Sequence, residues 1–205
     1  MKTTDVITHQ WPVPQPLSRV VVLGGSGFIG SRLVQHLIRG RVETVSVSSA
    51  QIDLCRPESV AMLQRLVQGD DALVITSALT PDKGRDAQTF MKNLLMGQHL
   101  GQFLQQSGSC AHVVYLSSDA VYADDVSLIR ERSCVSPATF HGLMHMVRER
   151  MLSQATAVFR IPTLMLRPCA VYGDGDTHNG YGPNRFVRSA LQERVIALFG
   201  QGEER

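Results

Sequence analysis

Short apolar, β-branched runs alternate along the chain with longer segments whose apolar residues recur at helical spacing. The short runs predict buried strands at residues 20–23, 44–47, 72–75, 113–116 and 163–166. Strands that alternate with helices in this way form parallel sheets with right-handed crossovers. The pattern therefore predicts an α/β fold, a Rossmann-type doubly wound parallel sheet, in which ligands bind beyond the carboxyl ends of the strands.

The segments between these strands predict helices. The first helix is expected to end at Gly40 in a left-handed carboxyl cap, and the second to run from Pro57 to Val67. Longer helices are expected near 86–106 and over 138–153.

Composition indicates a soluble globular protein with one domain. The 205 residues suit a single core, and a formal net charge of +2 gives no electrostatic reason for a nucleic-acid or membrane partner. Residues 1–18 carry Trp11 among prolines and predict an extended arm, so residues 19–205 form the folded domain. The first residues fit no secretory or transit peptide, and we therefore expect a cytoplasmic protein.

The cysteines are scattered and form no C-x-x-C pair, which argues against a structural zinc site or a disulfide framework. We expect reduced thiols, mostly buried, at Cys55, Cys110, Cys134 and Cys169.

A glycine-rich turn joins the first predicted strand to the first predicted helix. It contains Gly24, Gly27 and Gly30. Glycines permit a tight turn, a close approach of the backbone to a pyrophosphate and close packing of helix on strand, while the helix N-terminus attracts phosphate. We therefore predict a dinucleotide-binding turn; an ordinary flexible turn is the alternative, which the order of strand, glycines and helix disfavours.

The second predicted strand ends in Val47, Ser48 and Ser49, where dinucleotide-binding domains usually place a carboxylate for the adenosine ribose. That carboxylate would repel the additional phosphate of NADP. Because it is absent and no arginine follows directly, the sequence predicts NAD or NADP as cofactor, with NADP tolerated.

The glycine turn resembles the G-x-x-G-x-x-G form of the extended short-chain dehydrogenases. Other segments resemble the NAD-dependent epimerase/dehydratase family in order and spacing, and the resemblance spans about residues 19–205. The segments are Ile52-Asp53-Leu54, ITSALTP at 75–81, LSSDAVYAD at 116–124, LRPCAVYGDG at 166–175 and IALFGQGEER at 196–205. With the glycine turn, the resemblance assigns these residues to the cofactor: Gly24, Gly27, Phe28, Ile29, Gly30, Ser48, Asp53, Leu54, Ser77, Ala78, Leu79, Asn93 and Pro168.

The family's catalytic segment reads P-x-x-x-Y-G-x-x-K, with Glu four residues later. Pro137, Gly142 and Glu149 fix its register here, which puts His141 at the tyrosine position and His145 at the lysine position. In the family the lysine lowers the pKa of the tyrosine, which transfers a proton while hydride moves to or from the nicotinamide. This chain therefore replaces both members of the usual pair.

Two imidazoles one helical turn apart can exchange protons near neutral pH. We predict that His141 transfers the proton, that Ser118 polarises the substrate oxygen, and that a cationic His145 disfavours a proton on His141. One alternative is that the chemistry has been lost. Another is metal binding by the pair, but the spacing alone is weak evidence and we expect no metal site.

A polar, glycine-bearing loop is expected over residues 176–185, after the fifth strand. Its place beside the predicted nicotinamide site makes Tyr181, Asn184 and Arg185 the substrate candidates, and Arg185 suits a phosphate or carboxylate. A solvated surface loop is the alternative. Ala170 stands where the family often has a substrate-contacting Asn, so the acceptor pattern differs.

The resemblance implies an NAD(P)-dependent epimerase, dehydratase or reductase acting on a nucleotide-activated sugar or related polyol, with a homodimer as one arrangement. The alternative is an NAD(P)-binding protein without turnover, a sensor or complex subunit. Because the family continues beyond this point, we expect the small carboxyl-terminal substrate lobe, which starts near 174–205, to be truncated or missing.

Overall fold

Parallel strands form a single sheet at the centre of the fold. The computed structural model describes residues 13, 17–107, 110–124, 128–176 and 182–197. Its strands are β1 (Arg19–Leu23), β2 (Glu43–Val47), β3 (Asp71–Ile75), β4 (His112–Leu116) and β5 (Thr163–Leu166). All predicted strands are confirmed, and the predicted arm over 1–18 falls almost entirely outside the described residues.

The strand order β2-β1-β3-β4-β5 gives the sheet a switch point between β1 and β3. The chain leaves β1 in one direction to reach β2 and crosses back to reach β3, so the predicted doubly wound topology is confirmed. Leu23 pairs with both Val47 and Ile75, so the first three strands end side by side.

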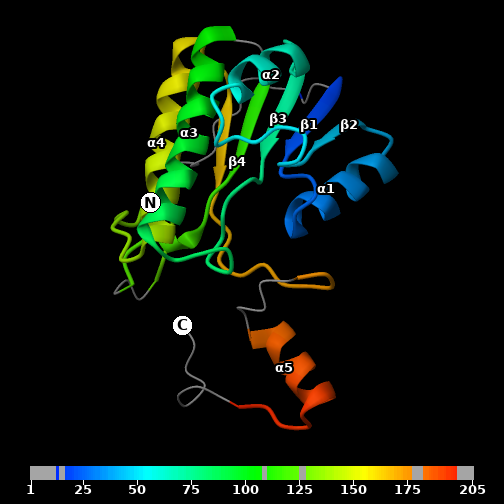
Figure 1. Ribbon diagram of the computed structural model, residues 1–205, viewed down its shortest axis with the longest axis vertical. Helices are drawn as coiled ribbons and strands as arrows, with labels where there is room; N and C mark the ends of the chain where they lie inside the picture. Colours follow the sequence, from blue (N-terminus) through cyan, green and yellow to red (C-terminus); the bar gives the residue numbers. More distant parts are fainter. Residues whose placement is uncertain (1–12, 14–16, 108–109, 125–127, 177–181, 198–205) are drawn as a thin grey trace.

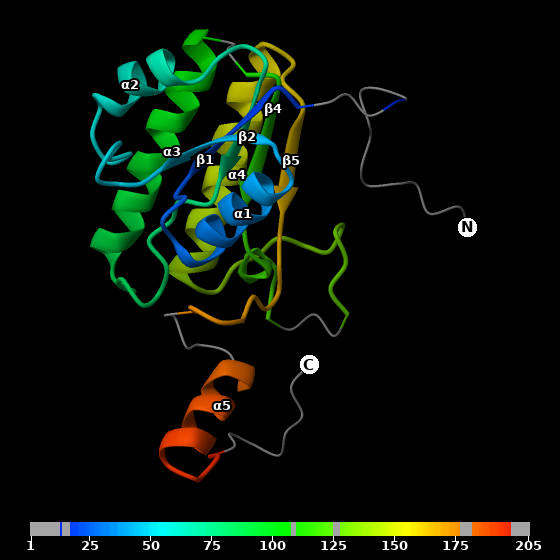
Figure 2. The same cartoon turned by 90° about the vertical axis from the view of Figure 1, so that its right-hand side faces the viewer.

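Helices cover the two faces of the sheet unequally (Figures 1 and 2). One face carries α1 (Phe28–Arg39), and the other carries α2 (Ser59–Leu66), α3 (Ala87–Ser107) and α4 (Phe140–Val158). Successive side chains of β1 point to opposite faces of the sheet. Val20 and Val22 pack toward α1, whereas Val21 and Leu23 enter the larger core. None of the described helices is long and apolar enough to span a bilayer.

The carboxyl cap of α1 differs from the expectation. Gly40 has a φ of −75°, and the left-handed residue is Arg41, with a φ of 59°. The N–H of Val42 donates to the carbonyl oxygen of Leu37 at 3.0 Å, which is the closing bond of a Schellman motif centred one residue later than predicted. The left-handed position of this cap is therefore occupied by Arg41, and Gly40 precedes it.

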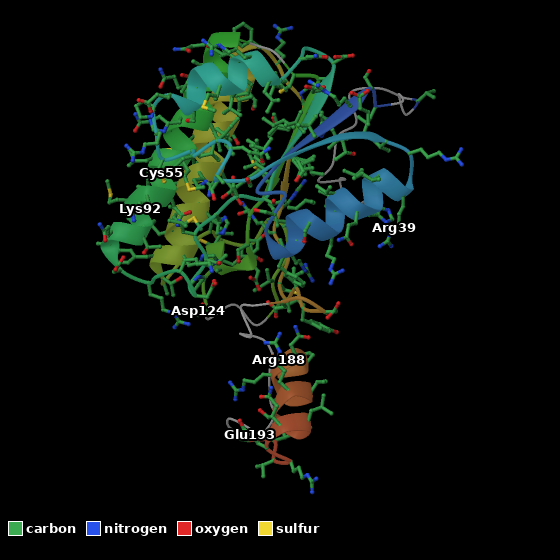
Figure 3. The ribbon with its side chains drawn as sticks, turned by 45° about the vertical axis from the view of Figure 1, so that its right-hand side comes forward. Arg39, Cys55, Lys92, Asp124, Arg188 and Glu193 are labelled. Atoms are coloured by element: carbon green, nitrogen blue, oxygen red, sulfur yellow. The ribbon has the colours of Figure 1, made fainter. Side chains whose placement is uncertain are left out.

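Two further expectations were wrong in detail. The helix predicted over 138–153 continues to Val158, since Ala155 and Thr156 carry its buried face onward. The cysteines are not mostly buried: Cys110 is buried, Cys55 is half-buried against α3 beside Lys92 (Figure 3), and Cys134 and Cys169 are exposed.

The expected polar loop over 176–185 is partly helical. α5 (Gly182–Gln192) lies beyond the carboxyl ends of the strands and apart from the two helical layers (Figures 1 and 2). Pro183 supplies the fixed φ that suits a first helical turn, and Val187 and Leu191 form an apolar stripe, both largely exposed. Asn184 and Arg185 therefore lie on a helix.

Candidate functional site

Two glycines of the turn after β1 are required by its backbone. Gly24 has a φ of 87°, and a Cβ there would lie 2.8 Å from the backbone nitrogen of Ser77. A Cβ on Gly30 would overlap the carbonyl oxygen of Gly24. The N–H groups of Gly24 and Gly25 both donate to Val47, at 2.9 and 3.1 Å, so the turn is bound to the end of β2.

The start of α1 offers its N–H groups to an anion. Gly27 caps the helix without a side-chain hydrogen bond, and the first turn contains no acidic residue. The N–H groups of Phe28, Ile29 and Gly30 have no acceptor within the helix, and their positive end lies at the β1–β3 switch point. The pyrophosphate of the dinucleotide implied by the sequence fits this terminus.

The end of β2 carries polar groups but no carboxylate. The backbone N–H and hydroxyl of Ser48 both donate to the side-chain oxygen of Gln51, at 2.8 and 3.0 Å. Asp53 accepts the N–H of Cys55 at 2.9 Å and is half-exposed, while Leu54 is buried. Asp53 is thus the first carboxylate after β2, several residues along the loop.

Asn93 holds the segment that follows β3. Its side-chain oxygen accepts the N–H of Leu79 at 2.9 Å, and its nitrogen donates to the Leu79 and Thr89 carbonyls at 3.0 and 3.2 Å. Asn93 is buried, and its amide is occupied by backbone. Ser77, Ala78 and Leu79 therefore follow β3 as predicted, and Asn93 holds Leu79 through hydrogen bonds to its backbone.

A pocket of about 240 Å³ lies between this segment and the start of α4. His141 and Asn93, both singled out from the sequence, are among its lining residues. Arg85 also lines it and was missed; a charged residue on a loop after a parallel strand was the available signal. The remaining lining residues are Leu79, Pro81, Gly84, Asp86, Thr89, Phe90, Thr139, Phe140 and Met144.

The two histidines of α4 lie together. Their ring centroids are 4.7 Å apart with the planes at 88°. His145 is 4% exposed, and burial, Arg148 and His141 hold the pKa of His145 well below its ordinary value. The expectation of a cationic His145 is therefore wrong, because desolvation favours the neutral imidazole.

Tyr115, near the end of β4, contacts His145 and was also missed. Its hydroxyl lies 2.7 Å from Nδ1 of His145. A tyrosine inside a buried apolar strand needs a hydrogen-bond partner for its hydroxyl. That requirement was the only signal in the sequence that could have identified Tyr115.

Ser118 lies at the N-terminus of a short 3₁₀ helix, η1 (Asp119–Val121). Its hydroxyl accepts the N–H of Ala120 and donates to Asp119, both at 3.2 Å. A Cβ on Gly142 would overlap the carbonyl oxygen of Ala120, so α4 packs directly against η1. This contact brings the Ser118 segment beside the first turn of α4, which carries His141.

A largely buried ion pair connects α4 to the residue that follows β5. Arg167 donates to Glu149 at 2.8 and 2.6 Å, and Ser117 donates to the same carboxylate at 2.6 Å. Arg167 also donates to the hydroxyl of Tyr122 at 2.8 Å. Glu149, used above only to fix the sequence register, is thus the anchor between α4 and β5.

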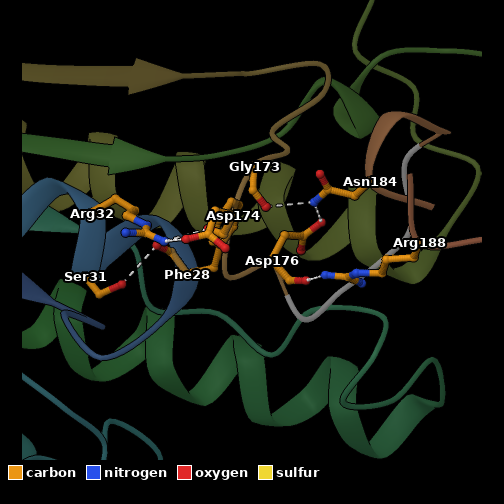
Figure 4. Close-up of polar contacts among 8 residues, drawn as sticks. All are labelled: Phe28, Ser31, Arg32, Gly173, Asp174, Asp176, Asn184 and Arg188. Carbon is orange, nitrogen blue, oxygen red and sulfur yellow. Dashed lines mark hydrogen bonds and ion pairs between the residues drawn. The ribbon is translucent and has the colours of Figure 1, made fainter. Parts of the chain in front are cut away.

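The segment after β5 folds against α1 (Figure 4). Arg32 donates to the carboxylate of Asp174 at 2.9 Å, and both residues line a second pocket of about 400 Å³ together with Tyr172. Asn184 donates to the carbonyl of Gly173 and to Asp176, both at 2.9 Å.

Of the predicted substrate residues, Asn184 therefore binds the protein's own loop, and Arg185 is partly buried on α5. Tyr181 lies outside the described residues. Pro168 lies beside η1, where its carbonyl accepts the N–H of Asp119 at 3.2 Å. Within the described ranges, no group of three or more His, Cys, Asp and Glu side chains is placed to hold a metal ion.

Comparison with known proteins shows which chains and folds this protein resembles. An uncharacterized UDP-glucose epimerase of Bacillus subtilis (strain 168) is 22% identical over 91% of the chain, which spans 66% of that protein. Among solved structures, a double mutant of the dTDP-glucose 4,6-dehydratase of Streptomyces venezuelae with NAD bound has a TM-score of 0.73 and 23% identity, over 90% of this chain and 65% of the other. The dTDP-4-dehydrorhamnose reductase of Bacillus anthracis with NADP has a TM-score of 0.69 and 17% identity, over 85% and 61%.

The chain thus spans about two-thirds of the length of these proteins, and the likeness of the structures concerns the fold. The family described as the NAD dependent epimerase/dehydratase family matches residues 20–205. The match includes the glycine turn, the β3 end and the α4 segment whose geometry is given above. The chain belongs to the NAD dependent epimerase/dehydratase family.

Proposed function

We propose that the chain binds NAD or NADP beyond the carboxyl ends of β1, β2 and β3. The pyrophosphate lies on the N–H groups at the start of α1, and Gly27 leaves room for it. The absence of a carboxylate at Ser48 and Ser49 supports tolerance of NADP. When bound, the cofactor supplies a hydride acceptor or donor.

The proposed reaction is that of an epimerase, dehydratase or reductase on a nucleotide-activated sugar. Family membership supports this class, as do the substrates in the names of the relatives. The observation that carries the assignment is His141, which lines the pocket beside the segment held by Asn93. His141 takes or gives the substrate proton, and Ser118 polarises the substrate oxygen.

Tyr181, Asn184 and Arg185 remain proposals for substrate contact. Because the Asn184 amide already binds Gly173 and Asp176, its contribution is to hold the loop against which substrate lies. The homodimer and the cytoplasmic location remain predictions.

His141→Phe tests this role. With UDP- and dTDP-hexoses and either cofactor, the variant should lose turnover while its cofactor affinity stays within about twofold. His36→Phe, at an exposed position of α1, is the matched control and should retain turnover. Unchanged turnover in His141→Phe would contradict the assignment and make Tyr122 and Tyr172 the next candidates.

A second function is a cofactor-binding protein without turnover. It is favoured by the register inferred from the sequence, in which His141 and His145 take the family's proton-transfer positions, and by the lowered pKa of His145. Cofactor binding without conversion of any sugar in the same panel would support this function over catalysis.

A further inference from the structure

A buried polar cluster lies behind the pocket, between β4 and α4. Tyr115 and Arg148 are fully buried, and His145 is nearly so. The Arg148 guanidinium lies 5.0 Å from the centroid of the Tyr115 ring and donates to the carbonyl of Ser77 at 2.9 Å. Gly97 of α3 makes room for this arginine, since a Cβ there would lie 2.8 Å from its Cγ. The cluster thus connects the predicted cofactor segment after β3 to the histidines.

The hydroxyl of Tyr115 lies against one ring nitrogen of His145. Burial raises the pKa of Tyr115 to about 12, so the phenol keeps its proton. A buried O–H group needs an acceptor, and the partner found here is Nδ1 of His145, at 2.7 Å. When Nδ1 accepts this bond, the proton of the neutral imidazole is on Nε2.

The charged groups around the cluster are consistent with a neutral His145. On α4, Arg148 adds positive charge nearby, and Glu149 is neutralised by Arg167 from the end of β5. Asp119 of η1 is bound to Ser118. Because no carboxylate among the described residues pairs with His145, protonation would place a second cation beside Arg148.

We propose that Tyr115 is a positioning residue, whose hydroxyl fixes His145 in the Nε2–H tautomer and thereby orients the ring against which His141 stands. The perpendicular contact between the two rings then holds His141 at the pocket wall. The role of His141 in proton transfer rests on the proposed function, whereas the tautomer of His145 does not.

Nitrogen-15 NMR of histidine-labelled protein tests this inference without substrate. In the wild type, His145 should show a bare Nδ1 and a protonated Nε2, unchanged between pH 8 and pH 6. Tyr115→Phe keeps the ring and removes the donor, so the single tautomer should be lost. Tyr172→Phe, at an exposed tyrosine, is the matched control and should leave the spectrum of His145 unchanged.

A protonated Nδ1 in the wild type would overturn the proposal, and this readout stands even if Tyr115→Phe fails to fold. An unchanged tautomer in folded Tyr115→Phe would also overturn it. Where turnover is measurable, Tyr115→Phe should lower kcat more than it changes KM. A wild type with the expected tautomer but without turnover contradicts the proposed function alone.

Discussion

The glycine turn and the first turns of α4 both lie at the carboxyl-end edge of the sheet, but they are built in different ways. At the turn, backbone meets backbone: Gly24 needs a positive φ, and Gly30 lies against its carbonyl oxygen. In α4, side chains from distant parts of the sequence meet, as His145 does with Tyr115. The turn therefore requires residues without a side chain, whereas the α4 region requires particular partner side chains.

This difference affects what each region tolerates. A backbone contact excludes every side chain, so the residue type is almost dictated. A network of buried side chains can be rebuilt with other residues as long as each polar group keeps a partner. The glycine turn keeps the family spacing, whereas His141 and His145, which we propose stand at the family's proton-transfer positions, lie within such a network.

The largest expected effect is at Gly30. Gly30→Ala puts a methyl group onto the carbonyl oxygen of Gly24 and should lower the free energy of unfolding by about 3 kcal/mol. Gly69→Ala is the control, because its Cβ would meet no heavy atom within 4 Å; it should change stability by less than about 0.5 kcal/mol. Urea unfolding measures both, and equal losses would show that the turn is not packed as described.

An effect of similar size concerns the ion pair between Glu149 of α4 and Arg167. Arg167→Leu leaves Glu149 buried without its cation and should cost about 3 kcal/mol. Arg32→Leu removes an exposed pair with Asp174 and should cost less than about 1 kcal/mol. Thermal unfolding of both variants makes the comparison, and a similar loss in both would contradict a side-chain anchor for α4.

The smallest effect is a dependence of stability on pH. The pKa of His145 is lowered in the folded state. As the pH falls below about 6.5, the unfolded chain is therefore protonated at this residue while the folded chain is still neutral there. Stability is therefore present in full above that pH and is lost below it, by at most about 1.4 kcal/mol per pH unit.

His145→Gln should flatten this dependence between pH 7 and pH 5. His112, whose pKa burial also lowers, contributes to the same slope, so His112→Gln is measured alongside and the double variant should lose both parts. An unchanged slope in His145→Gln would mean that His145 accepts a proton in the folded protein.

The sequence predicted the parts of the molecule that depend on local pattern. β5 begins and ends where the apolar run does, and the other strands begin one residue earlier than predicted. The glycine turn was predicted because its order of strand, glycines and helix is itself the structural requirement. The helix stripe of α5 was missed, since the glycines and polar residues before it favoured a loop.

Contacts between residues far apart in the sequence could not be predicted from local pattern. Tyr115 and His145 are 30 positions apart, and nothing near either residue in the sequence indicates their hydrogen bond. The charge expected on His145 was wrong for the same reason, because its burial in the folded chain lowers its pKa. Side-chain networks of this kind need the fold before their chemistry can be derived.

The measurement that bears most directly on the glycine turn as the NAD(P) site is calorimetric titration of NAD and NADP into the wild type and Gly27→Val. Gly27 lies at the uncapped start of α1, and a valine there would occupy the space the pyrophosphate needs. Gly69→Val, in open space, is the control. We expect both cofactors to bind the wild type and the control, and to bind folded Gly27→Val at least about tenfold more weakly, a loss of about 1.4 kcal/mol. Equal affinity in wild type and folded Gly27→Val would contradict the assignment of this turn to the cofactor.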